Sequence, residues 1–401
     1  MNQSVRILLD PRFYLSRLKT NLSKPGLVLL FVLLIPLIVL LGSLSKYGVA
    51  LYHQAMAGSL MAQILQGTGN IQTGSFTCEK LPALDEINGT WLSRSIDHLQ
   101  RSIYSAPLYS HSYLLLGRAY CFRGDPEKAI TAYRQYIRLR PKDPLGYIEL
   151  GYVNEIFNQK RQTLIVWKKA GLTTQDFISA GDSLRRANRF DEARQAYHHA
   201  GFFGLAQGDI RYYQGLIFED QQLWDKALIE YASAFGSTKW VKGGDIYYRE
   251  GLIEQKLYDS LAAIQNYKKA IESGDFSSNI TQADSLFRYV VLLEGQGEPI
   301  SLHIRELEQA INLDPYQYGS FAALGTAYYQ EFHDVPKAIS EIKSSIAINP
   351  NYVWSYLRLA QIYYSEKDWV LCKQTFTDLN HISPGSVEAK NVYDSLNGCN
   401  P

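Results

Sequence analysis

The stretch Gly117–Pro144 reads GRAYCFRGDPEKAITAYRQYIRLRPKDP, and its spacing decides the fold. Apolar residues recur at i, i+3, i+4 and i+7 in two segments, which is the pattern of two amphipathic helices. Between the segments, Asp125 and Pro126 indicate a helix start, because aspartate caps free N–H groups and proline suits the first helical position. Pro141 ends the second helix, since proline cannot continue the hydrogen-bond ladder. The stretch therefore predicts a helical hairpin whose marked residues serve packing rather than chemistry.

The small and aromatic residues of this hairpin recur along the chain. We expect Gly117 and Ala129 to be small because the two helices approach closely there, and Tyr120 and Tyr133 to fill the gap between hairpins. Half a copy, SIDHLQRSIYSAP, precedes the first full copy and ends at Pro107. A small residue and an aromatic mark six of about eight copies, namely Gly117 and Tyr133, Gly151 and Trp167, Gly181 and Tyr197, Gly215 and Tyr231, Gly251 and Tyr267, and Ala360 and Phe376. The sixth copy is degenerate, with Val291 where glycine is expected and Ala310 near its end, and the seventh is marked by the small residues Gly325 and Ala338.

The repeated pattern resembles the tetratricopeptide repeat family over residues 110–384. The resemblance implies an all-α fold, a right-handed superhelical solenoid of helix hairpins in which neighbours bury each other's apolar faces. We assign residues 91–384 to this solenoid, as a half repeat followed by about eight repeats. Residues 385–401 are expected to form a C-terminal capping helix and tail, with Ser386 as the N-cap and Gly398 at the helix end.

An uncharged run of 21 residues, Pro25–Ser45, precedes the repeats. A helix of this length spans roughly 31 Å, enough to cross a hydrocarbon core of about 30 Å. We therefore predict one transmembrane helix at residues 25–45. The alternative is a cleaved signal peptide, for which Ala55-Met56-Ala57 resembles a cleavage site. That site lies far beyond the apolar core, and this distance favours an uncleaved anchor.

The basic residues before the span predict its orientation. The chain has a formal net charge of +1, yet residues 1–46 carry about +5. Cytoplasmic flanks are enriched in lysine and arginine. Residues 1–24 should therefore form a basic cytoplasmic tail, either a plain topogenic signal or a segment lying along the anionic inner leaflet. The repeat domain is expected to be extracytoplasmic at the plasma membrane, after a juxtamembrane helix and connector at residues 46–90.

Nothing in the sequence calls for an active site. There is no P-loop, HExxH motif, nucleophile elbow or dinucleotide fingerprint. The histidines are scattered, and adjacent His198 and His199 point too far apart on a helix to share a metal ion. A net charge near zero also argues against nucleic-acid binding. We predict a noncatalytic protein without cofactor or metal.

The four cysteines permit two readings. If the domain lies outside the cytoplasm, disulfides become permissible. Cys399 follows the capping helix expected beside Cys372, and Cys78 precedes the array that contains Cys121. The alternative is four free thiols, with Cys372 as a buried small residue of the eighth repeat.

The resemblance places partner binding on a concave groove lined by the first helix of each hairpin. A lysine–asparagine clamp for acidic peptide tails is not supported, because Leu114 and Arg118 stand at the corresponding positions. Tyrosine and arginine instead predict an extended peptide or a glycan held by stacking and hydrogen bonds. Packing inside the protein is the alternative role of these side chains. The predicted groove residues are Arg118, Tyr152, Arg185, Tyr212, Tyr248, Tyr329 and Tyr364.

Two functions follow from this layout. The favoured one is a membrane-anchored scaffold that binds other proteins or peptides, chiefly membrane or envelope proteins, in an extracytoplasmic assembly. The alternative is an accessory subunit that handles glycan or cell-envelope polysaccharide for a separate membrane enzyme. A cytosol-facing organellar receptor has a similar layout, but the basic N-terminus opposes it.

Overall fold

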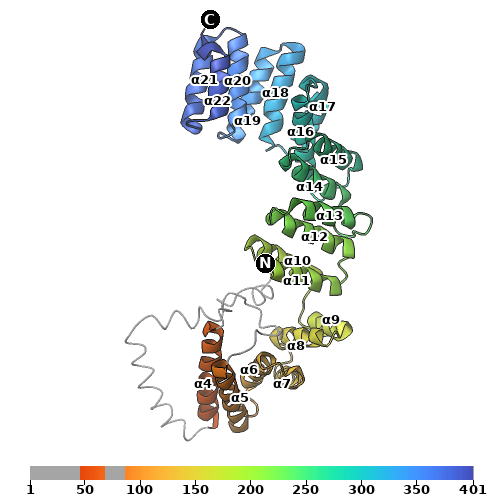
Figure 1. The fold of residues 1–401 in the computed structure, drawn as a ribbon, viewed down its shortest axis with the longest axis vertical. Coiled ribbons are helices and arrows are strands. Elements are labelled where there is room, and N and C mark those ends of the chain that lie inside the picture. Colours follow the sequence, from red (N-terminus) through yellow and green to blue (C-terminus); the bar gives the residue numbers. More distant parts are fainter. Residues whose placement is uncertain (1–45, 68–85, 401) are drawn as a thin grey trace, which may run out of the picture. The chain divides into compact units, whose positions relative to one another are not determined.

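The computed structural model describes residues 46–67 and 86–400. These residues form 19 α-helices with two short 3-10 helices and no strand (Figure 1). The prediction of an all-helical chain is therefore confirmed for the described residues. The chain divides into two compact units, the first ending at Leu205 and the second beginning at Ala206.

The first unit consists of antiparallel helix hairpins. Within each pair the first helix packs against the next one along the chain. The helices are α4 (Lys46–Gly67), α5 (Glu86–Ser105), α6 (Ser110–Phe122), α7 (Pro126–Leu139), α8 (Pro144–Ile156), α9 (Lys160–Lys169), α10 (Thr174–Arg186) and α11 (Phe190–Phe202).

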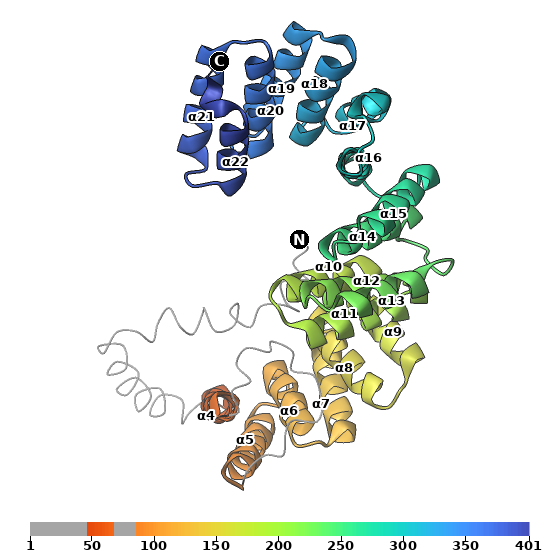
Figure 2. The same cartoon turned by 45° about the horizontal axis from the view of Figure 1, so that its top comes forward.

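The second unit continues the same arrangement and ends in a shorter helix. Figure 2 shows the last helix, α22, beside α20 and α21. The elements are α12 (Gln207–Asp220), α13 (Trp224–Ala234), α14 (Gly243–Lys256), α15 (Ser260–Ser273), α16 (Asn279–Gly295), η2 (Ile300–His303), α17 (Ile304–Leu313), α18 (Tyr318–Phe332), α19 (Val335–Ile348), α20 (Val353–Ser365), α21 (Trp369–Ile382), α22 (Val387–Ser395) and η3 (Asn397–Cys399).

The predicted turn chemistry is present in the hairpin of α6 and α7. Asp125 caps α7 by accepting a hydrogen bond from the Lys128 N–H, and Pro126 is the first helical residue. The helix ends at Leu139, two residues before Pro141. At the C-terminus Ser386 caps α22 as expected, but the helix ends at Ser395, before Gly398.

The glycines of the repeat make room for an aromatic ring from the same hairpin. A methyl group added at Gly117 would overlap the ring of Tyr133, and one added at Gly151 would overlap Trp167. The same overlap occurs between Gly181 and Tyr197, between Gly215 and Tyr231, and between Gly251 and Tyr267. Tyr133 therefore packs mainly across its own hairpin, rather than filling only the gap between hairpins.

The structure pairs the sequence's half repeat with a helix that the repeat pattern did not include. Helix α4 packs antiparallel along α5, where Ser102 Oγ donates to the Ala50 carbonyl at 2.8 Å and Ser95 Oγ to the Ala57 carbonyl at 3.1 Å (Figure 1). Ala57 is fully buried in this contact. The segment expected as a juxtamembrane helix therefore completes the first hairpin, and α5 begins at Glu86, ahead of the predicted boundary at residue 91.

The predicted membrane span at residues 25–45 lies outside the described residues, as do the whole basic tail and part of the connector. Among the helices that the structure does describe, none has the length and apolar character to cross a bilayer.

Candidate functional site

Each predicted groove residue lies on the first helix of a hairpin. The structure places one on each of seven first helices, with α4 and α16 contributing none. In chain order these are Arg118 on α6, Tyr152 on α8, Arg185 on α10, Tyr212 on α12, Tyr248 on α14, Tyr329 on α18 and Tyr364 on α20. We call the side chains on these helices, together with the groups that they contact, the first-helix face.

In two hairpins of the second unit, a buried tyrosine hydroxyl from the second helix reaches this face at the same sequence distance. Tyr231 donates to Glu219 Oε2 at 2.7 Å, and Tyr267 donates to Gln255 Oε1 at 3.1 Å. Both acceptors lie 12 residues before the tyrosine and four after the glycine that its ring covers. The ring is thus seated on a glycine and the hydroxyl is held one helical turn further along.

In the second unit this contact extends to the neighbouring hairpin. Arg249 on α14 donates to Glu219 Oε1 at 3.2 Å, so Glu219 joins three helices through Tyr231 and Arg249. Tyr212 stands beside them, with its ring centroid 5.6 Å from that of Tyr231. Burial raises the pKa of Tyr212, while Arg249 lowers it by its charge and by a hydrogen bond. Tyr212 is thus part of the packing between hairpins.

An equivalent cluster forms one hairpin later. Arg288 on α16 donates to Gln255 Oε1 at 3.1 Å and to Asp284 Oδ2 at 2.6 Å. Tyr248 donates to the same Asp284 oxygen at 2.7 Å. The pKa of Tyr248 is raised, first by burial and then by the charge of Asp284. Asp284 and Arg288 therefore fix Tyr248 between hairpins, and Gln255 takes the place that Glu219 has in the previous cluster.

In the first unit, Arg118 forms a buried ion pair. Its Nη2 lies 2.6 Å from Glu149 Oε1 on the next hairpin, and both side chains are nearly inaccessible. Tyr133 donates to the other oxygen of Glu149 at 3.2 Å. Because removing one partner of a buried pair leaves an uncompensated charge, Arg118 is committed to this joint.

Tyr152 packs in an aromatic cluster between two hairpins. Its ring centroid lies 5.2 Å from that of Trp167 and 5.6 Å from that of His199. His199 Nε2 lies 2.8 Å from Glu155 Oε2, so this histidine pairs with a carboxylate rather than with its neighbour in sequence. The described residues contain no group of three His, Cys, Asp or Glu side chains placed to hold a metal ion.

The three remaining predicted groove residues also have neighbours inside the fold. The Tyr329 hydroxyl donates to Glu366 Oε1 at 2.9 Å, and the Tyr364 ring meets Trp369 edge to face at 5.2 Å. Arg185 lies at the Tyr197 hydroxyl, where its charge and hydrogen bond oppose the rise in the tyrosine pKa that burial causes. All seven residues therefore contribute to packing, and a ligand-binding role for them stays a prediction.

Sequence reasoning did not single out the carboxylates and arginines that join the hairpins. Glu149, Glu219, Arg249, Asp284 and Arg288 carry the contacts between first helices. The acceptors of Arg249 and Arg288 could have been found from spacing, because Glu219 and Gln255 both follow a repeat glycine by four residues. The arginines have no constant offset from the glycine, so only the structure reveals them.

One carboxyl on α14 titrates in an unusual range. Glu250 is buried, and burial raises its pKa from 4.5 to about 7. The charge of Lys269 opposes this rise, and the charge of Glu254 adds to it. Glu250 therefore retains its proton up to near-neutral pH.

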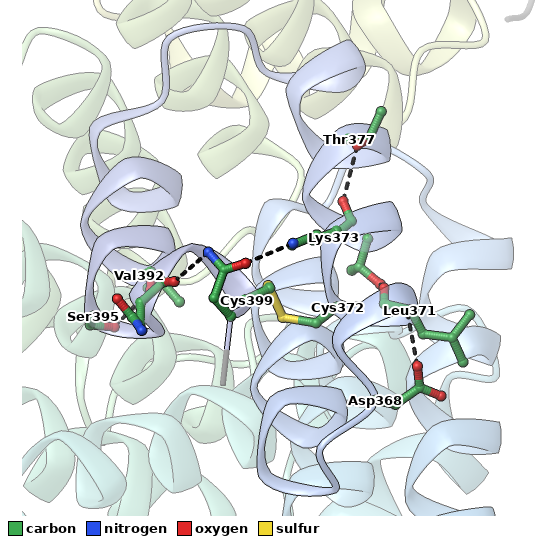
Figure 3. Close-up of a disulfide and its surroundings, with 11 residues drawn as sticks. Asp368, Leu371, Cys372, Lys373, Thr377, Val392, Ser395 and Cys399 are labelled. Carbon is green, nitrogen blue, oxygen red and sulfur yellow. Dashed lines mark hydrogen bonds between the residues drawn. A yellow bond between two sulfur atoms is a disulfide. The ribbon is translucent and has the colours of Figure 1, made fainter.

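A disulfide joins Cys372 on α21 to Cys399 after the last helix (Figure 3). The two Cα atoms are 5.8 Å apart, and 27 residues separate the cysteines in sequence. Beside the bond, Lys373 Nζ donates to the Asn400 side chain at 2.8 Å. The pairing predicted between Cys121 and Cys78 cannot be followed, because Cys78 lies outside the described residues, but none of the described cysteines is free.

Comparison with known proteins gives one family match. Residues 111–153 match the family model described as tetratricopeptide repeat. This match supports the interpretation of the chain as a tetratricopeptide-repeat protein, a class whose repeats suggest a protein-interaction scaffold. No curated protein matches the chain.

Several solved structures are similar to the chain. One is YrrB, described as a TPR protein with an unusual peptide-binding site, at 16% identity and a TM-score of 0.30, covering 56% of this chain and 96% of that one. Another is the Cut9–Hcn1 hetero-tetramer of APC/C, at 17% identity and a TM-score of 0.43, covering 77% of this chain and 59% of that one. A third is the TPR domain of P58(IPK), at 12% identity and a TM-score of 0.31, covering 84% of this chain and 97% of that one.

Proposed function

We propose that the protein is a noncatalytic scaffold, anchored in the plasma membrane by residues 25–45, that binds other proteins outside the cytoplasm. The observation that carries this proposal is a series of hairpins in which an aromatic ring packs against a glycine of the same hairpin. One stretch of this series matches the tetratricopeptide repeat. In our proposal the hairpins stack as a right-handed superhelix, whose first helices line a concave binding surface.

The disulfide supports the extracytoplasmic placement. Disulfides form and persist in oxidising compartments and are rare in the cytosol. Cys372 and Cys399 are joined although Cys372 stands where the repeat needs only a small side chain. The excess of lysine and arginine before residue 25 supports the same orientation, with the N-terminus in the cytoplasm.

The first-helix face is suited to binding an extended peptide, because its side chains are already held in place by contacts within the protein. Its tyrosine rings are held by hydrogen bonds and by neighbouring rings, so they lose little conformational freedom when a partner binds. Such rigid aromatic side chains are typical of binding hot spots. Half-buried Tyr329 and Tyr364 in the second unit are suited to this role.

Site-specific photo-crosslinking tests the binding surface. A benzophenone amino acid replaces Tyr329 or Tyr364 in the full chain, and the control replaces Val370 on the second helix α21, which is 77% exposed. We expect partner proteins in native membranes to crosslink from the two tyrosine positions and not from Val370. Crosslinking only from Val370 would place binding on the second helices and refute the groove.

A topology assay tests the anchor independently of any partner. A reporter that is active only in the cytoplasm is fused after Pro401, and a second fusion places it before Met1. We expect activity from the N-terminal fusion alone. Activity from the C-terminal fusion would put the repeats in the cytoplasm.

A further inference from the structure

The first unit carries many more cations than carboxylates in its central hairpins. Residues 134–169 contain eight lysines and arginines but three carboxylates. Each carboxylate is already engaged: Asp143 caps α8, Glu149 pairs with Arg118, and Glu155 pairs with His199. The cations of this stretch are therefore not neutralised by the acids within it.

Antiparallel pairing gathers most of these cations at one end of the helices. The bond between Ser102 and Ala50 places the last turn of α5 beside the first turn of α4. Arg140 Nε donates to Ser110 Oγ at 3.2 Å, which places the end of α7 beside the start of α6. We call this the basic end, and its exposed cations are Lys46, Arg138, Arg140, Lys142, Lys168 and Lys169.

The last turn of α9 belongs to the same end. Trp167 Nε1 donates to the Ile148 carbonyl at 3.1 Å, so α9 ends beside the first half of α8. Helix α8 itself begins at this end, directly after the loop that holds Lys142. Among the described residues, none of the six cations lies within 4.0 Å of a carboxylate oxygen.

Large apolar side chains are exposed among these cations. Tyr104 is 89% exposed at the end of α5, Leu108 is 73% exposed in the following loop, and Tyr47 is 59% exposed in the first turn of α4. Tyrosine is enriched at membrane–water interfaces, and basic residues are attracted to anionic lipid headgroups. The combination is typical of a surface that rests on a bilayer.

We propose that the basic end is a second membrane contact, which binds anionic lipid headgroups and inserts Tyr104 and Leu108 at the interface. This inference rests on the proposed anchor, because Lys46 at the basic end directly follows the uncharged run 25–45. An anchor at that point holds this end of α4 near the headgroups. The acidic second unit, with 25 aspartates and glutamates against 16 lysines and arginines in residues 206–400, is repelled by the same surface.

Lysine footprinting in lipid nanodiscs tests this contact. The full chain is reconstituted in discs of zwitterionic lipid, with or without anionic phosphatidylglycerol, and an amine-reactive reagent is followed by mass spectrometry. We expect anionic lipid to slow modification of Lys142, Lys168 and Lys169 about fivefold. Lys160 is the internal control, because it is exposed at the opposite end of α9. High salt should remove the protection, since it screens charge over a few ångströms.

Substitutions of exposed residues identify the side chains responsible for the protection by anionic lipid. Arg138→Glu with Arg140→Glu should abolish protection of the reporter lysines, and Tyr104→Ser with Leu108→Ser should weaken it. Arg161→Glu at the opposite end of α9 is the matched control and should change nothing. Thermal unfolding of each variant verifies that the fold is retained.

The outcomes separate the two proposals. A chain that fails to enter nanodiscs would refute the anchor and the basic-end contact with it. A chain that enters, but whose Lys142, Lys168 and Lys169 react equally in both lipid compositions, would overturn the basic-end contact and leave the anchor standing. Protection by a soluble acidic polysaccharide but not by anionic lipid would assign the basic end to a polymer and also overturn the membrane proposal.

Discussion

Gly215→Ala tests whether the repeat glycines exist to seat a ring. In the interior of a free helix this change should stabilise by about 1 kcal/mol, because alanine has the higher helix propensity. Here the new methyl group would overlap the ring of fully buried Tyr231, with Tyr231 Cδ1 only 2.7 Å away. The ring cannot retreat freely, since its hydroxyl is held by Glu219 at 2.7 Å. Overpacking of a filled core costs about 1–3 kcal/mol and more than offsets the propensity gain, so we expect a net loss of stability of up to about 2 kcal/mol.

Two further glycines provide the comparison. Gly58 lies inside α4 with no atom within 4 Å of an added methyl group, so Gly58→Ala should stabilise by about 0.5–1 kcal/mol. At Gly251 the corresponding Cδ1 atom of Tyr267 is 3.0 Å from the added methyl group, a milder overlap, and the cost should be smaller than at Gly215. Urea unfolding of the detergent-solubilised full chain measures all three. The reasoning would be refuted if Gly215→Ala stabilised the protein as much as Gly58→Ala.

Three other changes test separate features of the fold. The folded Glu250 carboxyl keeps its proton up to about pH 7, whereas the unfolded one loses it near pH 4.5. The stability that the protonated carboxyl contributes is therefore complete below about pH 4.5 and is lost as the pH rises through 7. Because glutamine does not ionise, the stability of Glu250→Gln relative to the parent should increase by about 2–3 kcal/mol from pH 5 to pH 8, as measured by urea titrations. Tyr258 is 93% exposed with φ +63°, a conformation that asparagine adopts more readily, so Tyr258→Asn should raise stability by about 0.5–1 kcal/mol in thermal melts. Cys372→Ala removes a disulfide that spans 27 residues and should cost about 3 kcal/mol, and a reducing agent should destabilise the parent more than the variant, which keeps only the disulfide of Cys121.

The sequence by itself determined the helical hairpins of the repeats and, where a capping residue is present, where their helices begin. Asp125 with Pro126 predicted the start of α7, and Ser386 predicted the cap of α22, because caps and prolines act on backbone groups within a few residues of themselves. The repeated glycines also showed where helices approach closely, since only small residues permit such contact.

Only the tertiary structure decided what the face of the first helices contacts. From the sequence, Tyr212 and Tyr248 could serve either ligand binding or packing. In the structure, Tyr212 contacts Arg249 and Tyr248 donates a hydrogen bond to Asp284, in each case on the first helix of the next hairpin. These contacts join residues more than 30 positions apart, at offsets that vary between hairpins. No local pattern encodes such a pairing.

The role of residues 46–67 was likewise decided by tertiary contacts. From the sequence, a helix whose one charged residue is Lys46, following an apolar run, could equally well be an extension of a membrane span. Its packing partner is α5, whose Ser102 and Ser95 hydroxyls donate hydrogen bonds to the Ala50 and Ala57 carbonyls. The antiparallel course of α4 and α5 then sets which cations share an end, because side chains far apart in sequence meet only when helices reverse direction.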